Sequence, residues 1–199
     1  MKFYKIISVI LHPIVVPTIG VILYFLLVPN YLGSNQKLIL LSLVFVTTYL
    51  IPLLILILFK KIKLVKSFNA NSIKERKIPI AIMIVLFYLL GNTLFKIANL
   101  DDLGFLFYAT CVALVLVYFL FFFNLKTSIH LTSMGITTGF FMVLGAKYSH
   151  PFPTTIIITI VLAGMVANAR LHLKAHTPLE VYLGYFVGFL SPFATYYFL

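Results

Sequence analysis

Long apolar runs recur along the whole chain, and they constrain its fold more than any other feature. They fall at about residues 5–28, 37–59, 78–98, 103–124, 129–147, 152–169 and 178–198. Each is long enough, or nearly so, to cross a hydrocarbon core roughly 30 Å thick as a helix that rises about 1.5 Å per residue. Open sheets are excluded from lipid, and the regular alternation of a barrel is absent, so these runs predict helices. The sequence therefore predicts an all-α, polytopic integral membrane bundle of six to seven transmembrane helices, with residues 1–199 as a single domain.

The composition excludes a soluble fold and explains the positive charge. Of the 199 residues, 62% are hydrophobic and 10% are charged, whereas an ordinary soluble domain has about 45–50% and about 25%. The net charge of +11 is compatible with a nucleic-acid partner. However, the basic residues lie in the gaps between apolar runs, which is the pattern of membrane topology. We therefore expect no nucleic-acid binding. The first apolar stretch lacks a small-residue cleavage site, so we expect a retained helix and not a signal peptide.

The distribution of Lys and Arg predicts the orientation. Seven crossings place the N-terminus and the loops at 60–77, 125–129 and 170–177 on one face of the membrane. Of the 15 Lys and Arg residues, only Lys37, Lys96 and Lys147 fall on the other face. By the positive-inside rule, the first face is cytoplasmic, and we expect the protein in a bacterial inner membrane.

Three polar clusters lie on that first face, each at a predicted helix boundary. They are NSIKERKIP at 71–79, KTSIH at 126–130 and ARLHLKAHTPLE at 169–180. They bring Lys and Arg together with two histidines, His130 and His176, and with the carboxylate of Glu180. Cations near histidines suit a reacting anion. Phosphoryl transfer is the natural candidate, because its transition state spreads negative charge over three oxygens that Arg and Lys can bind.

The third cluster resembles a motif of the type 2 phosphatidic acid phosphatase superfamily. Arg170, five residues, His176, three residues and Glu180 is similar to the third motif of that family, which reads Ser-Arg, five residues, His, three residues, Asp. The resemblance implies a metal-independent lipid phosphatase without a cofactor, whose substrate is a membrane lipid phosphate or diphosphate. It implies that His176 attacks phosphorus and forms a phosphohistidine, that Glu180 holds the other imidazole nitrogen, and that Arg170 binds phosphate oxygens.

The other two clusters resemble the remaining motifs of the family. Ser128-Ile129-His130 is similar to the second motif, Pro-Ser-Gly-His, which implies that Ser128 binds phosphate and that His130 protonates the leaving oxygen and then activates water. Lys74, Arg76 and Pro79 resemble a loosened first motif, which reads Lys, six residues, Arg-Pro. The chain departs from the three motifs at Asn69, Thr127, Ile129, Ala169 and Glu180, which replace Lys, Pro, Gly, Ser and Asp. This erosion favours the alternative of a non-catalytic relative that binds lipid or scaffolds a membrane complex.

Several of these residues also have structural interpretations. Ser72–Glu75 and Thr177–Glu180 are capping-box patterns, so each glutamate can begin a helix, and Ser128 can cap the helix after it. On a helix that begins near residue 73, Lys74 and Arg76 point about 200° apart, so only one can bind a given phosphate, and Arg76 is favoured.

A metal site is the chemical alternative. The spacing of His172, His176 and Glu180 would align metal ligands on an unbroken helix, but Pro178 argues against such a helix. We therefore expect no metal. A further histidine, His12, lies beside Pro13 and Pro17, where it either lines the same cavity or packs against a kink.

Overall fold

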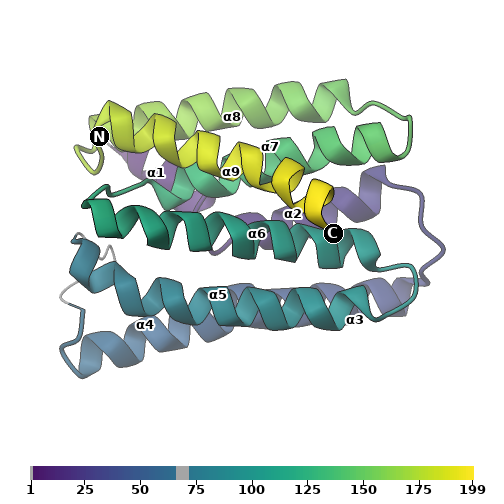
Figure 1. The fold of residues 1–199 in the computed structure, drawn as a ribbon, viewed down its shortest axis with the longest axis horizontal. Helices are drawn as coiled ribbons and strands as arrows, with labels where there is room; N and C mark the ends of the chain where they lie inside the picture. Colours follow the sequence, from purple (N-terminus) through teal and green to yellow (C-terminus); the bar gives the residue numbers. More distant parts are fainter. Residues whose placement is uncertain (1, 66–71) are drawn as a thin grey trace.

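The structure, a computed structural model, describes residues 2–65 and 72–199, and these residues form helices joined by short loops, without a strand among them. The helices run roughly along one common axis (Figure 1). In chain order they are α1 (Lys2–Ile10), α2 (Val16–Leu27), α3 (Ser34–Phe45), α4 (Ile51–Lys61), α5 (Ile73–Phe95), α6 (Asp101–Leu120), α7 (Ile129–Lys147), α8 (Pro153–His172) and α9 (Pro178–Phe198). A π-helical turn, η1 (Val46–Leu50), joins α3 to α4, and a 3₁₀ turn, η2 (Phe121–Phe123), follows α6.

Five helical segments of the described chain are long and apolar enough to cross a membrane. They are Ser34–Lys61, Ile73–Phe95, Asp101–Phe123, Ile129–Lys147 and Pro153–His172. The chain is therefore a helical bundle of the integral membrane type, with five candidate crossings where six to seven were predicted. The difference lies at the two ends of the chain. The last expected crossing, α9, has 21 residues, but it carries Glu180 and several tyrosines and is not among the five.

The first expected crossing is broken into two short helices by its prolines. Pro13 has no N–H, and its ring clashes with the carbonyl one turn earlier, so α1 ends at Ile10. The carbonyl oxygen of His12 then accepts the N–H groups of Val15 and Val16, at 2.8 and 3.1 Å, which closes the turn. The second proline, Pro17, lies in the first turn of α2, where its missing N–H is not needed. The two pieces still lead the chain from one end of the bundle toward the other (Figure 1).

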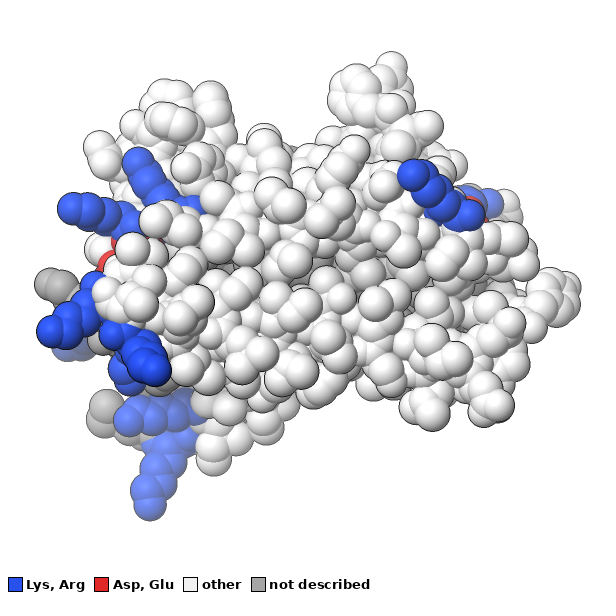
Figure 2. Space-filling model, turned by 90° about the horizontal axis from the view of Figure 1, so that it is seen from below, with Lys and Arg blue, Asp and Glu red and all other residues white. Residues whose placement is uncertain are grey.

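The loops divide between the two ends of the bundle as the apolar runs predict. The first residues of α1, the start of α5 and the connections that lead into α7 and α9 lie at one end, and the connections after α2, α5 and α7 lie at the other (Figure 1). Lys and Arg gather mainly at one end of the long axis, with a smaller group at the opposite end and an uncharged band between them (Figure 2). This distribution fits a protein whose middle lies in hydrocarbon and whose ends lie in water.

Glycines bring α7 and α9 into close contact. Gly135 and Gly139 on α7 face α9, and Gly184 and Gly188 on α9 face the start of α7. A Cβ atom on Gly184 would lie 2.6 Å from the carbonyl oxygen of Ser128, too close to be tolerated. Small residues at such positions let helix backbones approach closely in a membrane. The contact presses the beginning of α7, with the second polar cluster, against the beginning of α9, with the third.

A buried carboxylate ties three helices together at the opposite end. Asp102, in the first turn of α6, is only 2% exposed. Its Oδ2 accepts hydrogen bonds from the hydroxyls of Tyr24, at 3.1 Å, and Tyr148, at 2.7 Å. Its Oδ1 lies 2.7 Å from Nζ of Lys147. A buried charge that is paired and hydrogen-bonded in this way links α2, α6 and the end of α7, and sequence patterns did not predict it.

Candidate active site

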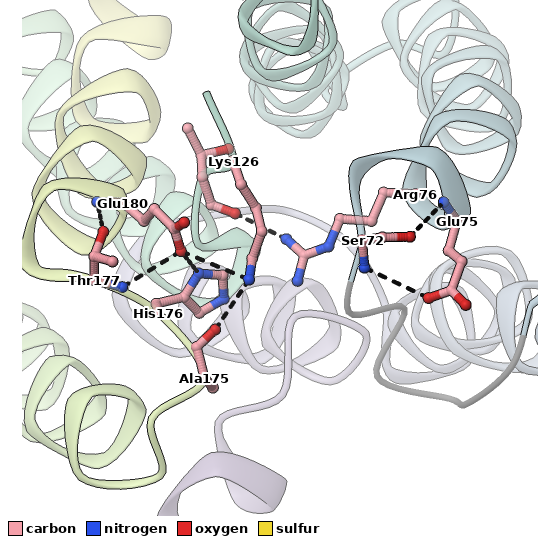
Figure 3. Close-up of polar contacts among 9 residues, drawn as sticks. Ser72, Glu75, Arg76, Lys126, Ala175, His176, Thr177 and Glu180 are labelled. Atoms are coloured by element: carbon pink, nitrogen blue, oxygen red, sulfur yellow. Dashed lines mark hydrogen bonds and ion pairs between the residues drawn. The ribbon is translucent and has the colours of Figure 1, made fainter. Parts of the chain in front are cut away.

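The centre of the polar end is a hydrogen bond between His176 and Glu180. His176 lies in the short loop between α8 and α9, with its side chain 1% exposed. Its Nδ1 lies 2.6 Å from Oε2 of Glu180 (Figure 3). Because a carboxylate only accepts hydrogen bonds, Nδ1 carries the proton. In a neutral imidazole, Nε2 then has a free lone pair, as a nucleophile requires.

Glu180 also caps the start of α9, so one carboxylate both contacts His176 and stabilises a helix. Its backbone N–H donates to Oγ1 of Thr177 at 3.3 Å, and its Oε2 accepts from the N–H of Thr177 at 3.4 Å. The predicted capping box is therefore confirmed. The same Oε2 lies 3.7 Å from Nζ of Lys126, which donates to the carbonyl oxygen of Ala175 at 3.2 Å (Figure 3). One carboxylate thus fixes the start of the helix, the orientation of the imidazole and the position of a lysine.

Burial keeps the imidazole of His176 neutral. The pKa of His176 is lowered to about 4, first because burial disfavours the charged ring and then because Arg76, Arg170 and Lys126 are nearby cations. The hydrogen bond to Glu180 acts in the opposite direction and only partly offsets these effects. The ring is therefore uncharged near pH 7, and it stands in a positive field that attracts anions.

Of the first polar cluster, Arg76 joins the site and Lys74 does not. The predicted capping box of Ser72 and Glu75 is confirmed, and α5 begins at Ile73. On this regular helix Lys74 is exposed, whereas Arg76 is 8% exposed. Nη1 of Arg76 donates to the carbonyl oxygen of Thr127 at 2.9 Å, and the guanidinium extends toward His176 and Lys126 (Figure 3). The first motif position occupied by Asn69 lies outside the described residues.

The loop before α7 presents two buried hydroxyls without a hydrogen-bond partner among the described residues. They are Oγ1 of Thr127 and Oγ of Ser128. Ser128 stands at the N-cap of α7, but its side chain makes no capping hydrogen bond, so the capping interpretation is wrong. Its backbone N–H donates instead to the carbonyl oxygen of Glu180 at 3.0 Å. Buried hydroxyls normally find partners, so these two are available to a ligand.

Arg170 and His130 meet through a serine of α1. Nη1 of Arg170 donates to Oγ of Ser8 at 2.9 Å. Nε2 of His130 lies 3.1 Å from the carbonyl oxygen of Ser8 and 3.4 Å from its Oγ. Because a carbonyl only accepts, Nε2 of His130 carries a proton. The Nε of Arg170 is buried and has no partner among the described residues, so the guanidinium has unused donor capacity.

Of the other histidines near this end of the bundle, His12 belongs to the site and His172 does not. His12 packs edge-on against His130, with ring centroids 5.0 Å apart, so it belongs to the inner wall of the site. His172 is exposed and stacks on Tyr4 at 4.3 Å. The helix needed to align His172 with His176 and Glu180 is interrupted, because α8 ends at His172 and α9 begins only at Pro178. The described residues contain no group of three His, Cys, Asp or Glu side chains placed to hold a metal ion.

Two residues of the site were not assigned a role from sequence. Lys126 lies within the second polar cluster at 126–130, and its position close to His130 is the signal that the sequence offers. Ser8 had no such signal, because a serine in an apolar helix is unremarkable until folding brings it beside Arg170 and His130. Together, the described residues combine a neutral imidazole with a free Nε2, a second imidazole with a hydrogen on Nε2, three cations and unused hydrogen-bond donors. Comparisons of the chain with known protein families, with curated proteins and with solved structures find no match.

Proposed function

We propose that this chain is an integral membrane phosphatase that hydrolyses a lipid phosphate or diphosphate through a phosphohistidine at His176. The observation that carries the proposal is the buried His176–Glu180 pair, 2.6 Å apart, among Arg76, Arg170 and Lys126. A carboxylate on Nδ1 leaves Nε2 as the nucleophile and stabilises the positive ring that forms when Nε2 bonds to phosphorus.

The first chemical step transfers the phosphoryl group to the protein. Nε2 of His176 forms a bond to phosphorus while the bond from phosphorus to the lipid oxygen breaks. His130 enters this step as an imidazolium, the form that a bound phosphate anion favours, and its Nε2 gives a proton to that leaving oxygen, which departs as an alcohol or, from a diphosphate, as a monophosphate. In the structure the Nε2 proton is directed at the carbonyl oxygen of Ser8, and a substrate oxygen replaces that acceptor on binding, because catalytic hydrogen bonds often form only in the complex.

The second step returns the protein to its starting state. Neutral His130, now without its proton, removes a proton from a water molecule. The resulting hydroxide attacks phosphorus, the bond to His176 breaks, and inorganic phosphate leaves. During both steps the guanidinium groups of Arg76 and Arg170 balance the charge on the phosphate oxygens, and the free hydroxyls of Thr127 and Ser128 donate to them.

The position of the site supports a lipid substrate. His176 lies at the end of a bundle whose long helices are apolar enough for a membrane, so a phosphate at the headgroup level can reach it sideways from the bilayer. Polyprenyl diphosphate, phosphatidyl phosphate and lipid A phosphate have this form. The resemblance of the three polar clusters to the type 2 phosphatidic acid phosphatase motifs agrees with the proposal. The excess of Lys and Arg at this end favours a cytoplasmic orientation in a bacterial inner membrane (Figure 2).

The test is phosphate release by the purified protein from a panel of lipid phosphates, compared with His176→Ala and with His172→Ala as the matched control. His172 is exposed and stacked on Tyr4, so its loss should leave turnover unchanged. His176→Ala should lower turnover by roughly a hundredfold or more, and rapid quenching of the unaltered protein should trap phosphate on histidine. Undiminished hydrolysis by His176→Ala would remove the nucleophile. Failure of the unaltered protein to hydrolyse any lipid phosphate would favour the scaffold alternative.

A further inference from the structure

An apolar cavity lies inside the bundle, next to the polar site. Its volume is about 150 Å³, and α2, η1 with α4, α5, α6 and α7 contribute its walls. Its lining includes Pro13, Gly20, Pro52, Pro79, Ile129 and Phe140. Three of these are prolines in or beside helices, where the backbone is interrupted and neighbouring helices cannot pack as regular cylinders.

The cavity begins beside the residues of the candidate active site. Pro13 follows His12 directly, Ile129 lies between Ser128 and His130, and Pro79 stands one helical turn after Arg76. From this end the lining continues along α5 to Phe87 and along α7 to Phe140. At about 1.5 Å per residue these distances are roughly 12 and 16 Å. Half of a hydrocarbon core roughly 30 Å thick is about 15 Å, so the cavity extends through about one leaflet.

The wall of the cavity offers almost no polar surface, although several Ser and Thr residues line it. The hydroxyls of Thr132, Ser133 and Thr137 donate to carbonyl oxygens of their own segment, at 3.1, 2.9 and 3.0 Å. Thr110 does the same to Leu106 at 2.8 Å. Of the described hydroxyls in this wall, Oγ1 of Thr48 on η1 is the one left without a partner. A cavity of this kind suits a hydrocarbon chain and not water or a polar ligand.

We propose that this cavity holds one extended hydrocarbon chain of the lipid whose phosphate lies at Arg76, Arg170 and His176. The inference rests on the proposed function and narrows its substrate class. A single amphiphile matches both surfaces at once, because its anionic head faces the cations and its chain continues along the apolar wall. A depth of about one leaflet fits a lipid that inserts one chain, such as a polyprenyl or single-acyl phosphate. It does not fit the many chains of lipid A, which a volume of about 150 Å³ cannot hold together.

Two glycines provide a matched pair of variants. A Cβ atom added at Gly20 meets nothing within 4 Å, and Gly20 is a buried part of the cavity wall. A Cβ atom at Gly164 on α8 also meets nothing within 4 Å, but Gly164 is exposed on the outside of the bundle. Gly20→Leu should therefore place a side chain in the cavity from a position where its Cβ meets no neighbour, and Gly164→Leu makes the same chemical change in an apolar helix away from the cavity.

The experiment measures binding of alkyl phosphonates, from ethyl to octyl, to the protein in lipid nanodiscs, with empty nanodiscs subtracted. Phosphonates carry the anionic head but cannot be hydrolysed, so binding is read independently of catalysis. For the unaltered protein and Gly164→Leu, affinity should rise about fourfold per methylene, as expected when each leaves water for an apolar site. Gly20→Leu should bind ethyl phosphonate normally and octyl phosphonate at least about tenfold more weakly.

The outcomes distinguish this inference from the proposed function. The chain site would be overturned, even if phosphatase activity is present, by either of two results. One is that the affinity of the unaltered protein for phosphonates does not change with chain length. The other is that Gly20→Leu keeps the same increase of affinity with chain length as the unaltered protein. Chain-dependent binding without hydrolysis of any lipid phosphate would leave the chain site in place and reject the enzyme. If Gly20→Leu does not fold, Thr48→Leu narrows the same cavity from η1. It should likewise bind ethyl phosphonate normally and octyl phosphonate at least about tenfold more weakly.

Discussion

Replacing Glu180 by Gln removes one negative charge from the candidate active site and leaves the size of the side chain almost unchanged. The structural cost should be small. Gln can serve at the third position of a capping box, so the bond to the N–H of Thr177 survives. The ion pair with Lys126 has both side chains 21% exposed and is 3.7 Å long, so its loss should cost no more than about 1 kcal/mol. The melting temperature should fall by at most about 2–4 °C.

The catalytic cost should be much larger, because the charge on His176 develops only during the reaction. A carboxylate and an imidazolium with charge centres about 4 Å apart attract each other by about 4 kcal/mol at an effective dielectric constant of about 20. Losing that term in the transition state lowers turnover by about three powers of ten. The amide of Gln can also donate to Nδ1, which would move the ring proton to Nε2 and remove the nucleophilic lone pair. Neutralising the acid of a catalytic triad has an effect of about 10⁴-fold.

The assay is phosphate release and thermal melting measured on the same preparation, with Glu75→Gln as the matched control. Glu75 occupies the same capping-box position at the start of α5, and its replacement should affect neither quantity by more than a small factor. Glu180→Asp keeps the charge but shortens the reach by one methylene, so it should give intermediate turnover. The reasoning is refuted if Glu180→Gln retains turnover within a few-fold, since the carboxylate would then only cap α9.

Three further expectations concern the site and one concerns the opposite end of the bundle. Because the pKa of His176 is lowered to about 4, the fall of kcat/KM on the acid side of the pH profile should be centred near pH 4, where the imidazole gains a proton; an acid-side fall centred near the ordinary value of about 6.5 would contradict this. Ser8→Ala removes the acceptor of Arg170, and kcat/KM should fall about 10- to 100-fold, as for a lost hydrogen bond to a charged group; Ser8→Thr should restore most of it. Ser34→Cys and Lys61→Cys replace residues at the two ends of one span, and in a background without the native cysteine they should label from opposite sides of the membrane. Labelling of Lys61→Cys by an impermeant reagent in intact cells would place the site outside the cytoplasm. Asp102→Asn should lower the stability measured by thermal melting by about 3 kcal/mol, because it breaks a buried ion pair, and an unchanged melting curve would show that this cluster does not hold the helices together.

Local features of the fold could be predicted because they depend on neighbours in the chain. Apolar runs of membrane-spanning length become helices in lipid whatever they pack against, since every backbone N–H and C=O must be satisfied within the segment. The capping boxes at Ser72 and Thr177 depend on residues three positions apart, so they were also visible. The length of the first apolar run predicts one helix, although the run contains Pro13 and Pro17. The structure divides it there.

The assembly of the site required the tertiary structure. Spacing along the sequence placed Arg170, His176 and Glu180 in one motif, but it could not show that Arg76 turns inward while Lys74 stays exposed. Whether the hydroxyl of Ser128 caps a helix or stays free depends on how closely α7 approaches α9, and facing glycines set that distance. Ser8 is the clearest case, because it meets Arg170 across 162 residues of sequence. Periodicity reports which face of a helix is apolar, whereas only packing decides which polar atoms share a buried space and which of them remain without partners.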